Sequence, residues 1–457
     1  MIAKKKIFNV FVIFLICHLI IWTLIPSISN INLPLDTIEA LAWGSNLDWG
    51  FSKHPPFSAF AVEFVYLIFG NQDWAYYLLS QIFVVIAFIY IWKFSLEIFE
   101  DKIYSLISLL ILEGIYFYNF ITPEFNVNIC QLPFWALTIY YFWRSTNSNT
   151  NLDWILFGVF SALGFLSKYL FIYLLFTILI YMLINFKKNK KLIIKYLFSI
   201  FISFLILTPH FIWLYENNFV TISYGFNRTG LIDSNMIDHL INPALFILKQ
   251  IVILLPVFIM IYILLKKVKI KINFKDKKTF FLIIINTVPL FLILATSLFT
   301  GAKIRTMWMT PFYLFLGILL VEIFKKNILL NNFNKFKIVF LFFFILSPML
   351  YLGVSLLDNT KRTDYPGKEI ARLVQNKWDK NFSNEIKIVV GDEWSAGNLS
   401  YHLNSRPTWM NSLKNKSSEI TEDQGVIYVG NTKILKKICP GVFGSISPVG
   451  YCMIGKR

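Results

Sequence analysis

Charged residues are scarce in this chain. They make up 15% of its 457 residues, against roughly 25% in a soluble protein, while 56% of residues are hydrophobic and the mean hydropathy is +0.61. The apolar excess excludes a disordered regulator and a soluble α/β enzyme. Cysteine is also rare, with four residues, which excludes a secreted disulfide scaffold.

Familiar catalytic and cofactor motifs are missing as well. The sequence contains no glycine-rich phosphate loop, no CxxC pair and no Ser/His/Asp signature. Of the five histidines, His18, His210 and His239 have no metal-ligand spacing. No internal repeat or low-complexity linker is evident. The functional argument therefore rests on where the few charges lie relative to the apolar runs.

Long apolar runs dominate what is present. A helix needs about 20 apolar residues to cross a hydrocarbon core of roughly 30 Å, and only helices satisfy their backbone groups in lipid when no barrel is indicated. The sequence therefore predicts an all-α polytopic membrane protein with about eleven spans. These are residues 7–25, 73–96, 103–121, 123–143, 152–167, 169–186, 192–214, 244–265, 279–299, 307–324 and 338–357. The first run is too long for a typical signal-peptide core, so it is predicted to be an uncleaved span.

Lysine and arginine are distributed unevenly between the predicted loops. Loops and helix ends assigned to the cytoplasm carry 22 of the 43 Lys and Arg residues, the opposite side up to residue 357 carries six, and the tail carries 15. The positive-inside rule applies to short loops and not to long domains, so the N-terminus is predicted to be cytoplasmic and the tail external. The net charge of +17 is thus a topology signal, and no nucleic-acid partner is expected.

The tail has the composition of a small folded domain. We predict a transmembrane domain over residues 1–357 and an α/β domain over residues 358–457, with helices at Pro366–Trp378 and Lys433–Lys437 and strands at Ile386–Val390 and Val426–Val429. Cys439 and Cys452 both lie in this exported tail, where an oxidising compartment favours a disulfide between them. Two buried thiols are the alternative.

The first external loop, residues 26–72, is long for a helix-bundle connection. Asp36–Asn46 and Phe57–Phe69 both read as helices in the interface plane with their apolar sides toward lipid. On a helix, Asp36 and Glu39 share a face. Paired carboxylates can bind a cation, or divide into a base and a positioning group; alternatively, they are ordinary first-turn acids favoured by the helix dipole.

Several cations lie close to the external boundary. Pro55 and Pro56 stiffen the backbone beside Lys53 and His54, where a cation suits an anionic lipid phosphate and a snorkelling lysine is the alternative. Arg228, Lys303 and Arg305 lie in external loops that are otherwise poor in cations. Arginine suits phosphate because its planar fork can bond two oxygens, although contact with lipid headgroups alone would also account for these three.

Three further ionisable residues lie within or beside predicted spans. Glu113 is deep in a span, where an ionisable group usually carries function or has a partner, and its partner is not evident from sequence. Lys168 lies at an external span end, where snorkelling explains it, and is a candidate supporting residue. Glu124, followed by Asn126, begins an external helix; both are candidate supporting residues, and a dipole-favoured acid is the alternative for Glu124.

Asp36-x-x-Glu39 and Lys53-His54-Pro55-Pro56, following a single N-terminal span, resemble glycosyltransferase family 39. This is the bacterial branch related to dolichyl-phosphate-mannose–protein mannosyltransferases and to the aminoarabinose lipid A transferase. The resemblance extends from residue 1 to about residue 410. In one departure, some members carry Asp-Glu as neighbours, whereas Thr37 follows Asp36 here. Further matching segments are Thr122-Pro123-Glu124, Ser167-Lys168-Tyr169, Pro209 through Trp213 and on to Arg228, Trp308-x-x-Pro311-x-Tyr313, Gly391 to Asn398, and Arg406-Pro407.

The resemblance implies a GT-C fold, which is a helical bundle with interfacial helices and an external catalytic cleft. It also implies a polyprenyl-phosphate sugar donor and inversion at the anomeric carbon. By position, Asp36 would be the catalytic carboxylate, and Lys53 and Arg228 would lie near the donor phosphate. We therefore expect a multi-pass protein of the bacterial inner membrane, in contact with membrane lipids, whose C-terminal domain is periplasmic.

The leading hypothesis is a glycosyltransferase that moves a sugar from a polyprenyl-phosphate donor to lipid A or another surface glycan. Asp36 and Glu39 would be its catalytic acids, and the donor phosphate would be bound by Lys53, His54, Arg228, Lys303 and Arg305. Because side chains can neutralise the phosphate, no metal or cofactor is required, although a divalent cation at Asp36 and Glu39 stays open. Protein O-glycosylation is an acceptor-level alternative. Two hypotheses of a different class also stay open: a flippase without chemistry, and a scaffold whose tail binds a partner.

Overall fold

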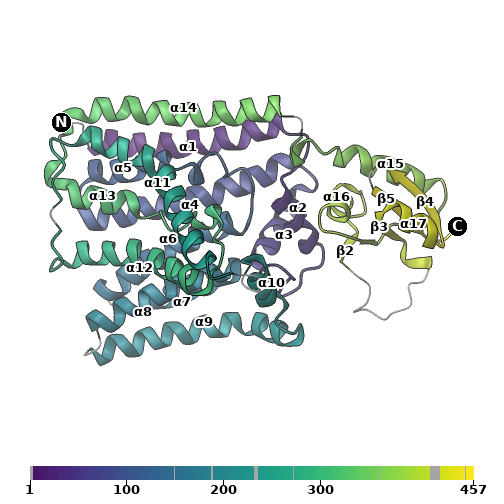
Figure 1. The fold of residues 1–457 in the computed structure, drawn as a ribbon, viewed down its shortest axis with the longest axis horizontal. Helices are drawn as coiled ribbons and strands as arrows, with labels where there is room; N and C mark the ends of the chain where they lie inside the picture. The colour runs from purple at the N-terminus through teal and green to yellow at the C-terminus, as the bar shows by residue number, and fades with distance from the viewer. Residues whose placement is uncertain are drawn as a thin grey trace.

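Long apolar helices lie alongside one another and form a bundle, and a smaller unit lies beyond one end of it (Figure 1). The computed structural model describes residues 4–148, 150–186, 189–230, 235–270, 272–358, 360–411, 422–447 and 449–457. In these ranges seven helical segments are long and apolar enough to cross a membrane. They contain α1 (Lys4–Ser29), α4 (Asp73–Phe99), α8 (Ile172–Phe186), α9 (Lys190–Glu216), α11 (Asp238–Leu264), α12 (Lys277–Thr300) and α14 (Phe333–Leu357).

The remaining predicted spans are short, irregular or, in the case of the 22-residue α6, not apolar enough to count as a span. They correspond to α5 (Lys102–Leu110), α6 (Val127–Ser148), α7 (Asn151–Ser167) and α13 (Leu316–Phe324). Beyond α5 the backbone continues as two 3-10 turns, Ile111–Gly114 and Tyr116–Tyr118. Irregular backbone is tolerated at membrane depth only where protein surrounds it, and these turns are largely buried. The polytopic helical class is confirmed, and the number eleven stays a prediction.

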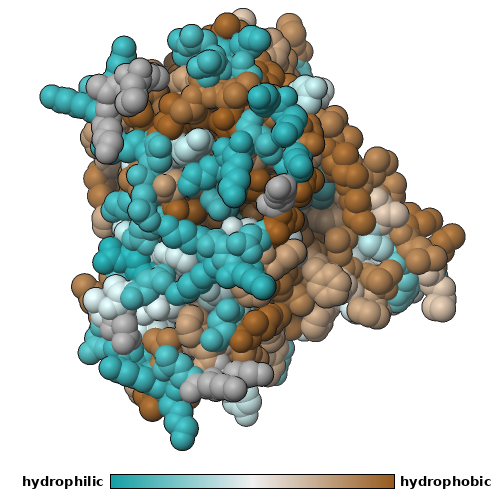
Figure 2. All heavy atoms as spheres, turned by 90° about the vertical axis from the view of Figure 1, so that its left-hand side faces the viewer, coloured by the Kyte–Doolittle hydropathy of each residue, from teal (hydrophilic) through white to brown (hydrophobic). Residues whose placement is uncertain are grey.

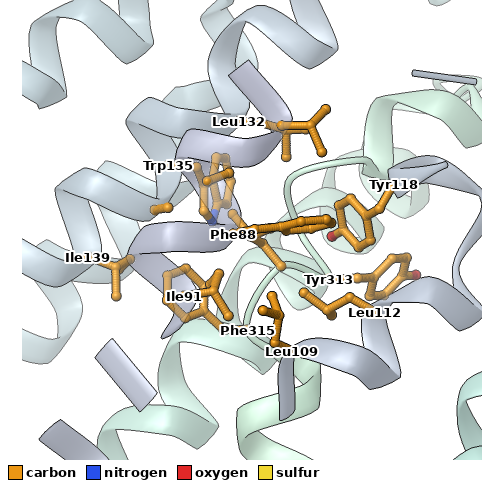
Figure 3. Packing of buried hydrophobic residues seen from close by; sticks show 14 of the residues in the cluster. Phe88, Ile91, Leu109, Leu112, Tyr118, Leu132, Trp135, Ile139, Tyr313 and Phe315 are labelled. Carbon is orange, nitrogen blue, oxygen red and sulfur yellow. The ribbon is translucent and has the colours of Figure 1, made fainter. Parts of the chain in front are cut away.

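Aromatic and branched side chains from distant segments meet in the middle of the bundle (Figure 3). Phe88 of α4 lies beside Tyr118, with ring centroids 6.2 Å apart, and Trp135 of α6 lies 5.1 Å from Phe312. Tyr118 Oη donates a hydrogen bond to the Thr310 carbonyl at 2.8 Å. The core thus joins the irregular segments before α6 and α13 to the long helices.

Small residues allow some of these helices to approach closely. A Cβ atom added to Gly317 of α13 would lie 2.0 Å from the Ser108 carbonyl oxygen of α5. Close backbone contact of this kind is a common source of packing energy between helices in membranes. By contrast, a Cβ at Gly353 of α14 would meet no atom within 4 Å.

One end of the bundle carries the lysine-rich segments. Hydrophilic side chains gather over this end, and hydrophobic side chains surround it on the flanks (Figure 2). Its exposed lysines include Lys5, Lys190, Lys266, Lys326 and Lys335. The uneven distribution seen in the sequence is therefore a property of one end of the folded bundle, and the assignment of that end to the cytoplasm stays a prediction.

From α15 onward the chain forms a small α/β unit, the C-terminal domain. In the part of this domain that the structure describes, five strands lie in the order β2-β1-β3-β5-β4, with β1 parallel to both β2 and β3, and β5 antiparallel to both β3 and β4. Its elements are α15 (Gly367–Asp379), β1 (Ile388–Val390), α16 (Ser395–His402), β2 (Thr408–Met410), β3 (Val426–Asn431), α17 (Thr432–Ile438), β4 (Val442–Ile446) and β5 (Val449–Ile454). The predicted Cys439–Cys452 disulfide is present and ties the end of α17 to β5.

The expected small α/β unit is confirmed, including two predicted helices and two predicted strands. Four elements, α16, β2, β4 and β5, were not predicted from the sequence. The signal was weak because β2 has three residues, α16 carries few apolar residues, and β4 and β5 form a hairpin interrupted by glycines such as Gly444 and Gly450.

The first loop contains α2 (Leu35–Gly44) and α3 (Phe57–Phe69). The expectation that the apolar side of α2 faces lipid is wrong, because Ile38, Leu41 and Trp43 are buried. They pack against α3 and α16, and Ala42 and Trp43 share a hydrophobic core with the C-terminal domain. In α3, by contrast, Leu67 is 75% exposed, as expected for a helix with a lipid-facing side.

We expect Gly317→Ala to destabilise the protein by about 1–3 kcal/mol, because the new methyl group would overlap a backbone oxygen that cannot rotate away. Thermal unfolding of the full chain in detergent measures the effect. Gly353→Ala is the matched control and should leave the unfolding midpoint unchanged or raise it. Equal stability of Gly317→Ala and wild type would contradict the packing described for α5 and α13.

Candidate active site

The candidate site begins at the first turn of α2. Pro34 precedes the helix in an extended conformation, and Asp36 lies in the first turn, where the helix dipole favours an acid. The Asp36 backbone N–H donates to Glu124 Oε1 at 3.1 Å, and Thr37 Oγ1 donates to the Phe125 carbonyl at 3.2 Å. Asp36 and Glu124, 88 residues apart in sequence, are therefore held together by this helix start.

Buried polar groups hold the turn that carries Glu124 in place. Thr122 Oγ1 donates to the Asn119 carbonyl at 2.6 Å, and Asn119 Nδ2 donates to the Glu113 carbonyl at 2.8 Å. Glu113 Oε1 lies 2.8 Å from His18 Nδ1, and both side chains are buried. His18 of α1 is thus the partner that the sequence did not reveal for Glu113, and this pair supports the turn leading to the site.

Lys53 lies between two carboxylates. Its Nζ is 2.8 Å from Glu39 Oε1 of α2 and 3.4 Å from Glu393 Oε1 of the C-terminal domain. Burial, the largest single influence, lowers the pKa of Lys53, but the hydrogen bond to Glu39 and the charges of Glu39 and Glu393 outweigh it and raise the pKa overall. The lysine is therefore firmly protonated, and the pairing argues against Glu39 as an unengaged metal ligand.

Asp36 and Glu124 form a pair of like charges in a desolvated place. Burial is the largest cause raising the pKa of both. For Asp36, the charges of Lys168, Lys53, Arg228 and Arg305 oppose this rise, whereas the pKa of Glu124 is raised to about 8 by burial and by the Asp36 charge. Since two adjacent carboxylates do not both ionise readily, Glu124 takes the proton and Asp36 keeps the negative charge.

Lys168 is buried, with 6% of its surface exposed, so the snorkelling explanation is wrong. Its Nζ donates a hydrogen bond to Asn128 Oδ1 and lies 5.2 Å from the centre of the Trp308 ring. Burial lowers the pKa of Lys168 to about 7, while the charge of Asp36 acts in the opposite direction. This lysine is therefore the buried cation of the site, and its charge is sensitive to pH near neutrality.

The structure brings three more of the predicted cations onto neighbouring loops. Arg228 ends α10 (Val220–Arg228), and Lys303 and Arg305 follow α12. The Lys303 backbone N–H donates to the Thr229 carbonyl at 2.9 Å, which joins the two loops. All three side chains are exposed, and none forms an ion pair with a described residue.

His54 and Asn126 both have close contacts beside the candidate site. Burial, followed by the nearby positive charges, lowers the pKa of His54 to about 3, so His54 is neutral and brings no cation to the site. It packs instead between Trp43 and Tyr224. Asn126 Oδ1 accepts from the backbone N–H groups of Asn128 and Ile129, so this side chain caps the start of α6.

A small pocket opens among these groups. Its volume is about 10 Å³, roughly the space of one water molecule. Asp36, Glu39, His54 and Asn126 contribute to its lining. In the described ranges there is no group of three or more His, Cys, Asp or Glu residues that could hold a metal ion.

Three residues of the site were not identified as such from sequence. Asn128 and Trp308 hold Lys168, and Glu393 reaches Lys53 from the C-terminal domain. The segment around Glu393 stood out only through its resemblance to bacterial relatives. No local pattern could link Glu393 to Lys53, because the two are separated by most of the chain.

Comparison with known proteins agrees with the resemblance. The family model described as dolichyl-phosphate-mannose-protein mannosyltransferase matches residues 53–213. This segment includes Lys53, Glu124 and Lys168. No curated protein matches the chain.

Two solved structures share the fold over nearly the whole length. The crystal structure of ArnT from Cupriavidus metallidurans bound to undecaprenyl phosphate has a TM-score of 0.67 at 11% sequence identity and covers 98% of both chains. The apo state of the same protein has a TM-score of 0.63 at 10% identity, again with 98% coverage of both chains. The GT-C-type bundle with a small C-terminal sheet domain is therefore confirmed as the fold, and the chain is a multi-pass membrane protein.

We expect the Glu124 carboxyl to be protonated at neutral pH and to ionise near the pKa of about 8 that burial and Asp36 give it. Infrared titration of the purified protein should reveal a protonated-carboxyl band that disappears across that range and is missing in Glu124→Gln. In Asp36→Asn the same band should disappear at lower pH, because the neighbouring negative charge that raises the pKa of Glu124 has been removed. A band unaffected by Glu124→Gln would refute the assignment.

Proposed function

We propose that this protein is a membrane glycosyltransferase that transfers a sugar from a polyprenyl-phosphate donor to an acceptor of the cell envelope, with inversion at the anomeric carbon. One observation carries the proposal: Asp36 lies at a helix start under the influence of four cations from separate segments, Lys53, Lys168, Arg228 and Arg305. The matching family model and the shared fold with ArnT support it. In an envelope protein of this kind, the site end would face the periplasm and the lysine-rich end the cytoplasm.

The bilayer explains the placement of the site. A polyprenyl tail keeps the donor in the membrane, so its phosphate and sugar must be met where the bundle ends. Arg228 follows α9 through the short helix α10, and Arg305 follows α12; both α9 and α12 are long enough to cross a membrane. Exposed arginines at such helix ends suit the phosphate because a guanidinium bonds two of its oxygens.

The proposed chemistry is a single displacement. The acceptor hydroxyl oxygen forms a bond to the anomeric carbon while the bond from that carbon to the donor phosphate oxygen breaks, and the phosphate leaves with the electron pair. Asp36 accepts the hydroxyl proton late in this step. Lys168 and the arginines stabilise the leaving phosphate as its charge develops. Glu124, already protonated, positions the start of α2 by accepting the Asp36 N–H.

We propose that the reaction proceeds without a metal ion, because cationic side chains already lie around Asp36, where the phosphate would leave. The carboxylate of Glu39, the second residue considered for a cation site, is already paired with Lys53.

Two classes of acceptor fit the proposed reaction. We favour lipid A or another surface glycan, because the sequence resembles the aminoarabinose lipid A transferase through segments of both domains. A protein acceptor is the second candidate, and the family model over residues 53–213, described for protein mannosyltransferases, favours it. Mass spectrometry of lipid A, surface glycans and envelope proteins from a deletion strain separates the two, since only the true acceptor loses a sugar.

We expect Asp36→Asn to reduce sugar transfer by at least about 100-fold, the low end of what a general base contributes. Transfer from a polyprenyl-phosphate donor to envelope extract is measured with the reconstituted protein. Binding of undecaprenyl phosphate should persist in this variant, because the phosphate-binding cations remain. Near-normal transfer by Asp36→Asn would remove Asp36 from the base role.

Lys168→Met should move the acid limb of the pH–rate profile to higher pH. The Lys168 charge lowers the pKa of Asp36 against the raising effect of burial, so without it the carboxylate is protonated at higher pH and the base is lost sooner on acidification. Lys335→Met, at the lysine-rich end of the bundle, is the control and should leave the profile unchanged. An unshifted acid limb in Lys168→Met would contradict the electrostatic coupling.

A further inference from the structure

We propose that Glu393 of the C-terminal domain is a positioning residue that occupies Lys53 in the absence of donor and is displaced from it by the donor phosphate. The inference rests on the proposed function and assigns a role to the C-terminal domain, which sets the affinity of the site for the donor. Glu393 acts there through the balance of charge around Lys53.

The positive charge of Lys53 is already balanced by two carboxylates in this structure. One ammonium lies within 3.4 Å of the carboxylates of Glu39 and Glu393, so the group of three carries a net negative charge. Its members are shielded from water, with 23% of the Lys53 side chain and 14% of each glutamate side chain exposed. A phosphate approaching this group would be repelled unless one carboxylate leaves.

Of the two carboxylates beside Lys53, Glu393 is the one that the donor phosphate would displace. Glu39 is held on α2 and accepts a 2.8 Å hydrogen bond from Lys53, whereas Glu393 lies at the longer distance of 3.4 Å. The backbone around Glu393 is held without its side chain, because Asp392 Oδ1 accepts from the N–H groups of Trp394 and Ser395. The Glu393 side chain can therefore turn away from Lys53 while its turn stays in place.

The C-terminal domain is docked by contacts that do not involve Lys53. Arg406 binds Glu63 of α3 at 2.5 Å and the Leu41 carbonyl of α2 at 2.7 Å. The Trp409 backbone N–H donates to Ser45 Oγ at 2.8 Å. These bonds hold Glu393 beside Lys53 independently of the ion pair between the two. A change at Glu393 should therefore leave the domain in place.

Close packing of α16 on α2 completes the docking. A Cβ at Gly397 would lie 3.1 Å from Ala42 Cβ and 3.2 Å from Ile38 Cγ2. The helix that follows Glu393 thus touches the helix that carries Asp36 and Glu39. Displacement of Glu393 by a phosphate would therefore change a contact of the C-terminal domain without any large movement of α2.

The test is binding of undecaprenyl phosphate to the full-length protein in lipid nanodiscs. Glu393→Gln should bind it about fivefold more tightly than wild type, as expected for release of one partly buried ion pair. Glu369→Gln removes an exposed acid of α15 in the same domain and should bind as wild type does. Unchanged or weaker binding by Glu393→Gln would overturn the proposal.

A double-variant cycle identifies the route of the effect. In a Lys53→Ala background, Glu393→Gln should change binding no further, because Glu393 acts through Lys53. An equal gain in that background would mean that any lost negative charge strengthens binding, and the exchange would be rejected. Failure of wild type to bind undecaprenyl phosphate would instead reject the proposed function, so the two failures are distinguishable.

Discussion

The site depends on keeping one carboxylate charged where water is scarce. Burial opposes the ionisation of Asp36, and two features of the fold favour its charged form. Glu124 holds the one proton that the pair retains, and cations from four different segments act on Asp36. Both features act together, because burial favours the protonated form of each acid and repulsion between the two carboxylates keeps them from ionising together. The helix bundle brings these segments together at one of its ends.

The loop that carries α2 and α3 packs together with the C-terminal domain over that end. Their hydrophobic core is shared, since Ala42, Trp43, Phe51 and Ala59 pack with the interior of the small domain. This explains why α2 buries its apolar side in protein and not in lipid. Arg406, held at a positive φ of 48°, reaches across the same contact to α3. Lys53 consequently pairs with one carboxylate from the first loop and one from the C-terminal domain.

Much of the fold could be predicted because membranes impose simple rules. Length and hydropathy located the long helices, and the distribution of lysine distinguished the two ends. Hydropathy was a poor guide where a segment is surrounded by protein and not by lipid. The segments after α5 and before α13 are apolar enough to be predicted as spans, yet their backbone is irregular because buried protein partners surround it. For the site, Asp36, Lys53 and Glu124 were candidates by residue type and position, whereas Glu393 and the His18–Glu113 pair were beyond reach.

By itself the sequence determined that the chain crosses a membrane, that lysines concentrate at one end of the bundle while the candidate site residues lie near the other, and that the C-terminal segment forms a small α/β unit. These properties follow from local composition, which needs no knowledge of contacts. Tertiary structure alone decided which acid holds the proton, which lysine is buried and which is already paired, and that His54 is neutral. Each of these depends on distances between groups far apart in sequence, because desolvation and Coulomb interactions act through space and not along the chain.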